Sequence, residues 1–125
     1  RLLNINARSI ANKVEQLEYL SLLHDAELIA ITETWLHSDV KADEVFLSTY
    51  NVISNDRATR GGGVALLVKK PLRYETVPSI NGHESVWCKL FLDNTIFIVG
   101  VIYRAPGSPV EFLYALDQHL NNIKN

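Results

Sequence analysis

The chain has 125 residues, with 12 basic and 14 acidic side chains and a formal net charge of −2. Hydrophobic residues make up 47% of it and charged residues 21%, which is typical of a folded domain and excludes a disordered tail. No run of about 18 apolar residues occurs, so a membrane-spanning helix is excluded, and the near-neutral charge excludes attraction of nucleic acid over the whole surface. We expect one domain, and a piece of a longer protein, because the chain opens on Arg1 and contains no methionine.

The first third of the chain predicts a β-α-β unit. Residues 2–6 alternate apolar and polar side chains, as a short strand does. Asn12 stands three residues before Glu15, the pattern of a helix N-cap with its capping-box partner, and an apolar stripe continues at helical spacing to about His24. Residues 28–32 are a continuous apolar run, typical of a strand buried on both faces. This order predicts that the two strands are parallel.

The middle of the chain predicts further strands. They are expected at residues 50–54, 64–68, 86–92 and 95–103. Residues 37–48 are mixed in character and predict a loop with a short helical turn. Asp93 and Asn94 separate the last two strands and predict a tight hairpin turn.

A helix is predicted near the C-terminal end of the sequence. Ser108 is a suitable N-cap, Pro109 then stands at the first helical position, and Glu111 completes a capping box. The apolar stripe that we expect this helix to bury consists of Leu113, Leu116, Leu120 and Ile123.

Several of the predicted strands carry apolar side chains on both faces. Helices can cover one face of their sheet, and the other face needs a second sheet about 10 Å away. We expect that second sheet to come from outside the chain. The bare face would then make the chain alone aggregate or dimerise.

The carboxyl ends of the two parallel strands form the first candidate site, because ligands of open α/β sheets bind at that edge. The first strand ends at Asn4-Ile5-Asn6 and the second is followed by Glu33. A carboxylate suits Mg²⁺, and an amide can donate to a phosphate oxygen. The alternative, that these residues only end strands and cap turns, stays open.

Two further features allow a functional and a structural interpretation. The glycines at 61–63 precede a strand, whereas a phosphate loop opens a helix, so a turn with a close backbone approach is favoured. Tyr103 ends a strand and either donates to a phosphate or closes the core at its rim. Basic residues near the glycines form either a rim for a nucleic-acid backbone or a solvated hairpin; they are Arg57, Arg60, Lys69, Lys70 and Arg73.

Other catalytic and metal patterns are lacking in the sequence. The four histidines have no ligand spacing such as H-x-x-x-H, and Cys88 has no neighbouring cysteine, so no zinc site is predicted. No G-x-S-x-G motif occurs, which leaves an acyl-transfer nucleophile unsupported.

Four segments, taken together and in this order, carry a family resemblance. They are Leu-Asn-Ile-Asn-Ala-Arg-Ser at 3–9, Ile-Thr-Glu-Thr-Trp-Leu at 31–36, Gly-Gly-Gly-Val-Ala-Leu-Leu-Val at 61–68 and Val-Ile-Tyr-Arg-Ala-Pro at 101–106. The sequence resembles the endonuclease/exonuclease/phosphatase superfamily, in particular the endonuclease domain of non-LTR (LINE-type, Jockey-like) retrotransposons. The resemblance implies an α/β fold in which residues 1–125 are the N-terminal half of a domain. That half of a four-layered α/β sandwich would be a mixed β-sheet with flanking helices, the second sheet being missing.

The resemblance also implies roles for individual residues. Asn4 and Tyr103 match the catalytic residues, the active-site asparagine and the tyrosine that contacts the scissile phosphate. Glu33 matches the metal-binding glutamate, with Mg²⁺ or Mn²⁺ as the cofactor. Asn6 falls where some relatives have an acidic residue close to the metal. The residues implied as possible DNA contacts are Arg8, Arg57, Arg60 and Arg104.

The second half of the family's domain supplies a G-D-x-N strand and an Asp-His pair, and neither occurs in this sequence. The implied partners are therefore the C-terminal half of the domain, a downstream reverse transcriptase and target DNA, with action in the nucleus and no membrane contact. Two alternatives stay open at this point. One is another superfamily member, such as a lipid or inositol phosphatase or an exonuclease; the other is a non-catalytic transposon remnant.

Overall fold

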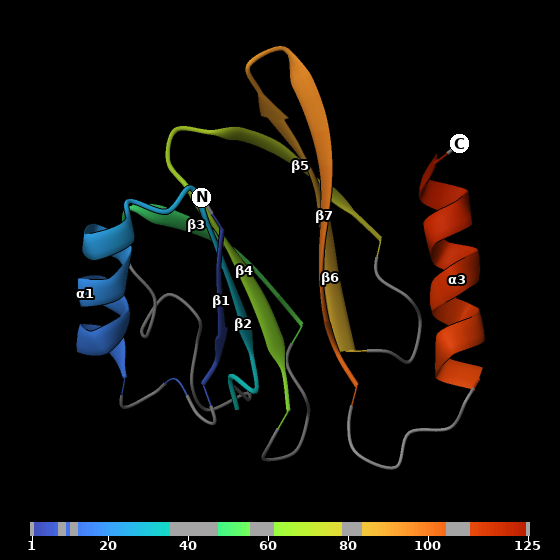
Figure 1. Cartoon of the computed structure of the whole chain (residues 1–125), viewed down its shortest axis with the longest axis horizontal. Helices are drawn as coiled ribbons and strands as arrows, with labels where there is room; N and C mark the ends of the chain where they lie inside the picture. The colour runs from blue at the N-terminus through green and yellow to red at the C-terminus, as the bar shows by residue number, and fades with distance from the viewer. Residues whose placement is uncertain are drawn as a thin grey trace.

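Two β-sheets lie face to face, with one helix outside each sheet, so that the layers run helix, sheet, sheet, helix (Figure 1). The computed structural model of the chain describes residues 2–7, 10, 13–35, 48–55, 62–78, 84–104 and 111–124. Helix α1 (Val14–His24) covers the outer face of one sheet, and helix α3 (Glu111–Lys124) lies outside the other. This arrangement confirms the α/β class and the layered sandwich architecture. Neither of these helices has the length and apolar character needed to cross a membrane.

The first sheet has the strand order β1-β2-β4-β3. Its strands are β1 (Leu2–Asn6), β2 (Leu28–Thr32), β3 (Tyr50–Asn55) and β4 (Val64–Lys69). β1 and β2 are parallel, as predicted, with Asn4 opposite Ala30 and Asn6 opposite Thr32. β4 is antiparallel to both of its neighbours. The parallel pairing brings the carboxyl ends of β1 and β2 to the same edge.

The second sheet is antiparallel, with the order β5-β6-β7. Its strands are β5 (Arg73–Val77), β6 (Glu84–Leu92) and β7 (Thr95–Tyr103). Asp93 and Asn94 form the predicted turn and have positive φ angles of 51° and 63°, which a two-residue hairpin turn requires. β5 was not predicted from the sequence, because Arg73 and Glu75 interrupt its apolar pattern at an edge of the sheet.

The expectation that the second sheet lies outside the chain is wrong. β4 carries apolar side chains on both faces because one face packs toward α1 and the other toward β6. On the α1 side, Ala65 and Leu67 join a buried cluster with Leu17. On the other side, the cluster between the sheets contains Val64, Leu66, Val68, Val86, Cys88 and Leu90. The chain crosses between the sheets after β4, so it supplies strands to both.

Helix α1 ends at His24, as predicted, but its N-cap position is occupied by Lys13, one residue after the predicted cap. Asn12 lies outside the described residues. The helix buries Leu17 and Ser21 against the first sheet. Residues 37–47, where a loop with a helical turn was predicted, also lie outside the described part of the chain.

Helix α3 only partly buries the apolar stripe that was predicted for it, since Leu116 is half-buried. Leu113 and Leu120 are 45% and 42% exposed, so the predicted stripe is not buried as a whole. The His119 ring instead lies against Trp87 of β6, with the ring centroids 4.8 Å apart. The Trp87 ring lies across Gly100, where a Cβ would come within 2.4 Å of it. The side chain of Ile123, like residues 105–110, lies outside what the structure describes.

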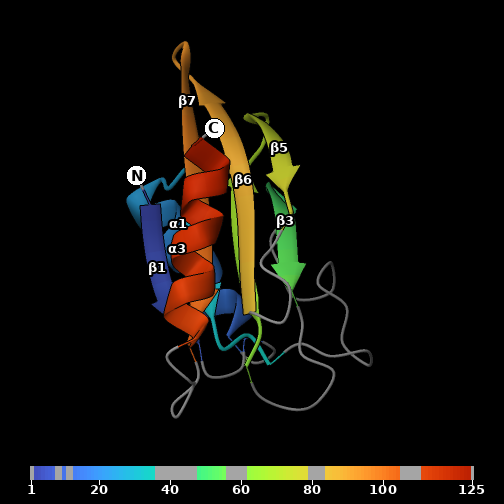
Figure 2. The same ribbon diagram turned by 90° about the vertical axis from the view of Figure 1, so that its right-hand side faces the viewer.

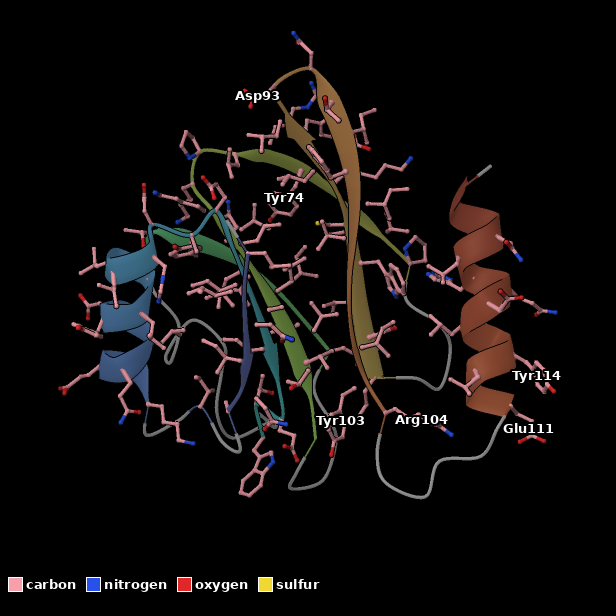
Figure 3. The ribbon with its side chains drawn as sticks, in the orientation of Figure 1. Tyr74, Asp93, Tyr103, Arg104, Glu111 and Tyr114 are labelled. Atoms are coloured by element: carbon pink, nitrogen blue, oxygen red, sulfur yellow. The ribbon has the colours of Figure 1, made fainter. Side chains whose placement is uncertain are left out.

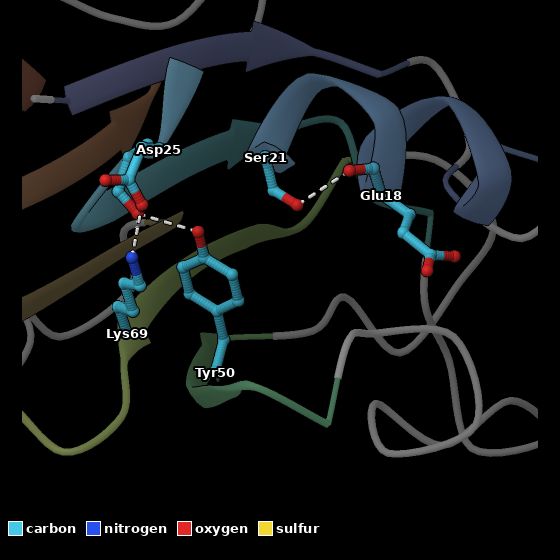
Figure 4. A network of polar contacts seen from close by, with 6 residues as sticks. Glu18, Ser21, Asp25, Tyr50 and Lys69 are labelled. Atoms are coloured by element: carbon cyan, nitrogen blue, oxygen red, sulfur yellow. Dashed lines mark hydrogen bonds and ion pairs between the residues drawn. The ribbon is translucent and has the colours of Figure 1, made fainter. Parts of the chain in front are cut away.

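A polar network ties the α1–β2 connection to β3 and β4 at the end of the first sheet opposite to Glu33 (Figure 4). Lys69 forms an ion pair with Asp25, and the hydrogen bond to that carboxylate raises the pKa of Lys69. The buried Tyr50 hydroxyl donates to the carbonyl oxygen of Ala26 at 2.6 Å. Burial raises the pKa of Tyr50. We therefore assign this network a role in stabilising the fold.

We predict that Tyr50→Phe lowers the free energy of unfolding by about 1–2 kcal/mol, because it removes the hydrogen bond to Ala26 within a buried contact. Urea unfolding of the full-length protein measures the change. Tyr19→Phe is the matched control, since Tyr19 is exposed on α1, and it should leave the unfolding midpoint unchanged. Equal midpoints for the wild type and Tyr50→Phe would contradict this role.

The edge strands β1 and β7 lie on the same side of the molecule (Figure 2). On β7 the side chains of Ile96, Phe97 and Ile98 are exposed, and the nine-residue strand carries no charge. An uncharged apolar edge can pair with another strand through its free backbone groups.

We therefore expect the 125-residue chain, produced by itself, to self-associate through this edge. Sedimentation velocity measures its mass in solution. Replacing Phe97 with lysine should reduce the association, because a charge on an edge strand opposes pairing. A chain that stays monomeric without this substitution would contradict the prediction.

Candidate active site

One end of the sandwich brings together polar side chains from both sheets. Glu33 directly follows β2, and Tyr103 is the last residue of β7. The Tyr103 hydroxyl donates a hydrogen bond to Oε1 of Glu33 at 3.2 Å. Figure 3 shows Tyr103 and its neighbour Arg104 at this end of β7. The structure thus joins two residues that the sequence analysis selected from distant segments.

A cavity of about 490 Å³ opens beside this pair, between β1, β2 and β7. Asn4 and Asn6 of β1 line it together with Tyr103 and Arg104. Its volume lies within the range of small-molecule sites in proteins. The other predicted DNA contacts, Arg8, Arg57 and Arg60, lie outside the described residues.

The backbone on both sides of Glu33 is tied to the segment that follows β1. The carbonyl oxygen of Thr32 accepts a hydrogen bond from the N–H of Ala7 at 2.9 Å. The carbonyl oxygen of Thr34 accepts one from the N–H of Ile10 at 3.0 Å. Glu33 itself has a positive φ of 55°, which costs a non-glycine residue about 1–2 kcal/mol. Such strain is typical of functional sites.

The glycine run holds the other side of the same segment. The N–H of Trp35 donates to the carbonyl oxygen of Gly62 at 2.9 Å, and that of Thr34 donates to Gly63 at 3.3 Å. Gly63 has a φ of 88°, and a Cβ on it would lie 2.5 Å from the Thr34 hydroxyl oxygen. The predicted close backbone approach is therefore confirmed. The backbone that Gly62 and Gly63 approach is the one next to Glu33.

Glu84, which was not predicted from the sequence, also lies at this end. Its Oε1 accepts a hydrogen bond from the N–H of Gly63 at 3.0 Å. Glu84 is the first residue of β6 and lies directly opposite Tyr103 in the hairpin register. Counting outward from the predicted turn at Asp93 and Asn94 would have paired these two positions, so the signal was present in the sequence.

The side chains at this end are hard oxygen donors. The Glu33 carboxylate accepts a hydrogen bond from the Tyr103 phenol, and the Asn4 and Asn6 amides line the cavity together with that phenol. Mg²⁺ is commonly bound by one or two carboxylates, with waters and phosphate oxygens completing its shell, so the donor set fits that ion. Within the described residues no group of three or more His, Cys, Asp or Glu side chains is placed to hold a metal.

Residues 3–124 match the Endonuclease/Exonuclease/phosphatase family. The match covers nearly the whole chain, and the four-layered arrangement of two sheets and two outer helices agrees with it. The chain belongs to this family. No curated protein sequence gives a significant match.

Solved structures share the fold at low sequence identity. The endonuclease domain of TRAS1, a telomere-specific non-LTR retrotransposon, is 14% identical with a TM-score of 0.72, and the match covers 98% of this chain and 52% of that one. The AP endonuclease LMAP from Leishmania major is 14% identical with a TM-score of 0.66, over 91% and 43% of the two chains. TDP2 from D. rerio, solved with a single-strand DNA product, is 12% identical with a TM-score of 0.61, over 99% and 54%.

The chain therefore spans about half the length of the solved structures that it matches. It contributes strands to both sheets, and the strands β1 and β7 end their sheets on the same side.

Proposed function

We propose that the protein containing this chain is a metal-dependent phosphodiesterase that nicks DNA, the endonuclease of a retrotransposon polyprotein. The observation that carries the proposal is the hydrogen bond between Tyr103 and Glu33 beside the cavity. A phenol that can bind a phosphate lines the cavity, and a carboxylate that can bind a metal accepts the hydrogen bond of that phenol. The fold shared with a retrotransposon endonuclease domain supports this choice within the family.

Each residue has a role in the proposal. Glu33 would hold Mg²⁺ or Mn²⁺, and the bound ion would polarise the phosphate. Tyr103 would donate its hydroxyl proton to a phosphate oxygen, and Asn4 would donate its amide to the same group or to a water. Asn6 would orient a water near the metal. Arg104, exposed at the cavity, would contact the DNA backbone.

The remaining parts of the reaction would come from outside the chain. In-line attack on phosphorus needs a group that orients the water and a group that stabilises the developing charge. We propose that the C-terminal half of the domain supplies both. A reverse transcriptase further along the polyprotein would extend the nicked strand, and the protein would then act in the nucleus.

The test uses the full-length protein with supercoiled plasmid, and with inositol phosphates and single-stranded DNA as competing substrates. We expect nicked circles with Mg²⁺ or Mn²⁺, and none after chelation by EDTA. Phosphate release from inositol phosphates, or digestion of single strands from an end, without nicking would favour another member of the family. Lack of activity on all three substrates would contradict the proposal and favour a non-catalytic remnant.

A further inference from the structure

The two sheets are joined by hydrogen bonds at the end that holds the candidate site. Such bonds run from residues at the ends of β6 and β7 to residues at the ends of β2, β3 and β4. Those within the described part of the chain include Asn55 Nδ2 to Ser85 O at 3.1 Å, Gly63 N to Glu84 Oε1 at 3.0 Å and Tyr103 Oη to Glu33 Oε1 at 3.2 Å. These contacts fix how the two sheets are placed relative to each other at the site.

The hydrogen bond between Gly63 and Glu84 differs from the others, because Gly63 is in turn hydrogen-bonded to the backbone next to Glu33. Gly63 uses both of its peptide groups: its N–H donates to Glu84, and its carbonyl oxygen accepts from the N–H of Thr34. Gly63 and Thr34 are both buried. A continuous set of hydrogen bonds therefore leads from a carboxylate on the second sheet to the residue next to Glu33.

The carboxylate is well suited to this task. The Glu84 side chain is long enough to bring an acceptor oxygen to 3.0 Å from the backbone nitrogen of Gly63. Gly63 has no side chain of its own to hold it in place, and its φ of 88° is maintained by the contacts of its peptide groups. Loss of the Glu84 acceptor would therefore release Gly63, and with it the support of Thr34 and Trp35.

We propose that Glu84 is a positioning residue of the candidate active site, which holds Glu33 in place for its ligand through Gly63 and Thr34. The inference rests on the proposed function of Glu33 as a metal-binding carboxylate. Glu84 acts through the length of its side chain, which sets the position of the acceptor oxygen. The proposed role does not require a negative charge near the metal.

Two conservative variants of the full-length protein distinguish the effect of side-chain length from the effect of charge. Glu84→Gln keeps the length and an acceptor oxygen but loses the charge, whereas Glu84→Asp keeps the charge and shortens the side chain by one methylene. Glu75→Gln is the matched control, since Glu75 is an exposed carboxylate on β5. The two readouts are hydrogen exchange of the Gly63 and Thr34 amides, and the affinity for Mn²⁺ measured by titration calorimetry.

We expect Glu84→Asp to speed exchange of the Gly63 amide by about tenfold or more and to weaken Mn²⁺ binding by about 10- to 100-fold, the usual effect of removing an outer-shell support. In Glu84→Gln, the amide exchange rates and the affinity for Mn²⁺ should stay within about threefold of the wild-type values. The control Glu75→Gln should have the wild-type values. For plasmid nicking, we expect Glu84→Gln to have nearly normal kcat and KM values. Glu84→Asp should have a lower kcat.

The opposite pattern, normal Mn²⁺ binding in Glu84→Asp and weak binding in Glu84→Gln, would overturn the proposal, because the charge would then act on the metal directly. Unchanged exchange at Gly63 in Glu84→Asp would overturn it as well. A wild-type protein that binds no Mn²⁺ would contradict the proposed function of Glu33. The exchange rates would still decide whether Glu84 holds the Gly63 segment.

Discussion

Replacing Glu33 with glutamine should lower metal-dependent nicking by about 10²- to 10³-fold, since it removes the charge that would hold the metal. The amide oxygen can still accept the hydrogen bond from Tyr103, and the backbone at φ 55° keeps a side chain of the same shape. The free energy of unfolding should therefore change by less than about 0.5 kcal/mol.

Plasmid nicking and urea unfolding of the full-length protein measure the two effects side by side. Glu75→Gln on β5 is the control and should change neither, because Glu75 is exposed in the other sheet. If Glu33→Gln lowers stability and nicking in parallel, Glu33 is a structural residue and its assignment as a metal ligand is wrong.

Gly63→Ala should destabilise the protein by about 3 kcal/mol. A positive φ of 88° costs an alanine about 1–2 kcal/mol, and its Cβ would lie 2.5 Å from the Thr34 hydroxyl oxygen, which adds about 1–3 kcal/mol of overpacking. Because Thr34 is next to Glu33, displacement of the threonine should also weaken Mn²⁺ binding.

A double-mutant cycle with Thr34→Ala separates the two causes. Gly63→Ala should cost less free energy of unfolding when the Thr34 hydroxyl is absent, because the overpacking is then relieved. The cost of the positive φ angle should remain. Strict additivity of the two substitutions in urea unfolding would show that the contact between Gly63 and Thr34 does not cause the loss.

The parts of the fold that could be predicted from the sequence are those fixed by local patterns. The parallel pair β1 and β2 and the hairpin of β6 and β7 follow from apolar alternation and from turn residues adjacent in sequence. β5 was missed because an edge strand needs little apolar character, so its Arg73 and Glu75 carry no strand signal. The buried face of α3 depends on Trp87, a residue on a distant strand.

The second sheet could not be assigned for a related reason. A strand that is apolar on both faces, as β4 is, predicts two covering layers but does not say which segments supply them. The crossing of the chain between the sheets after β4 is a tertiary event with no local signature. It is also what brings Tyr103 from one sheet to Glu33 of the other.

The residues of the candidate site could be predicted where they lie at the ends of predicted strands. Glu33 and Tyr103 come from strand ends that the sequence located, and the structure joins them. Glu84 was missed because a carboxylate at the start of a strand is common, and its significance depends on Gly63, a residue in the other sheet. The roles of Asn4, Asn6 and Arg104, which line the cavity, stay predictions.

The most direct test of the central claim is to locate Mn²⁺ in crystals of the full-length protein by anomalous diffraction. Mn²⁺ takes the same oxygen ligands as Mg²⁺ and can be identified by its anomalous signal. The proposal predicts a peak at about 2.1 Å from a carboxylate oxygen of Glu33, on the side of the cavity that Asn4 and Tyr103 line. A Mn²⁺ ion bound elsewhere in the domain, with the Glu33 carboxylate still held by Tyr103 and free of metal, would contradict it.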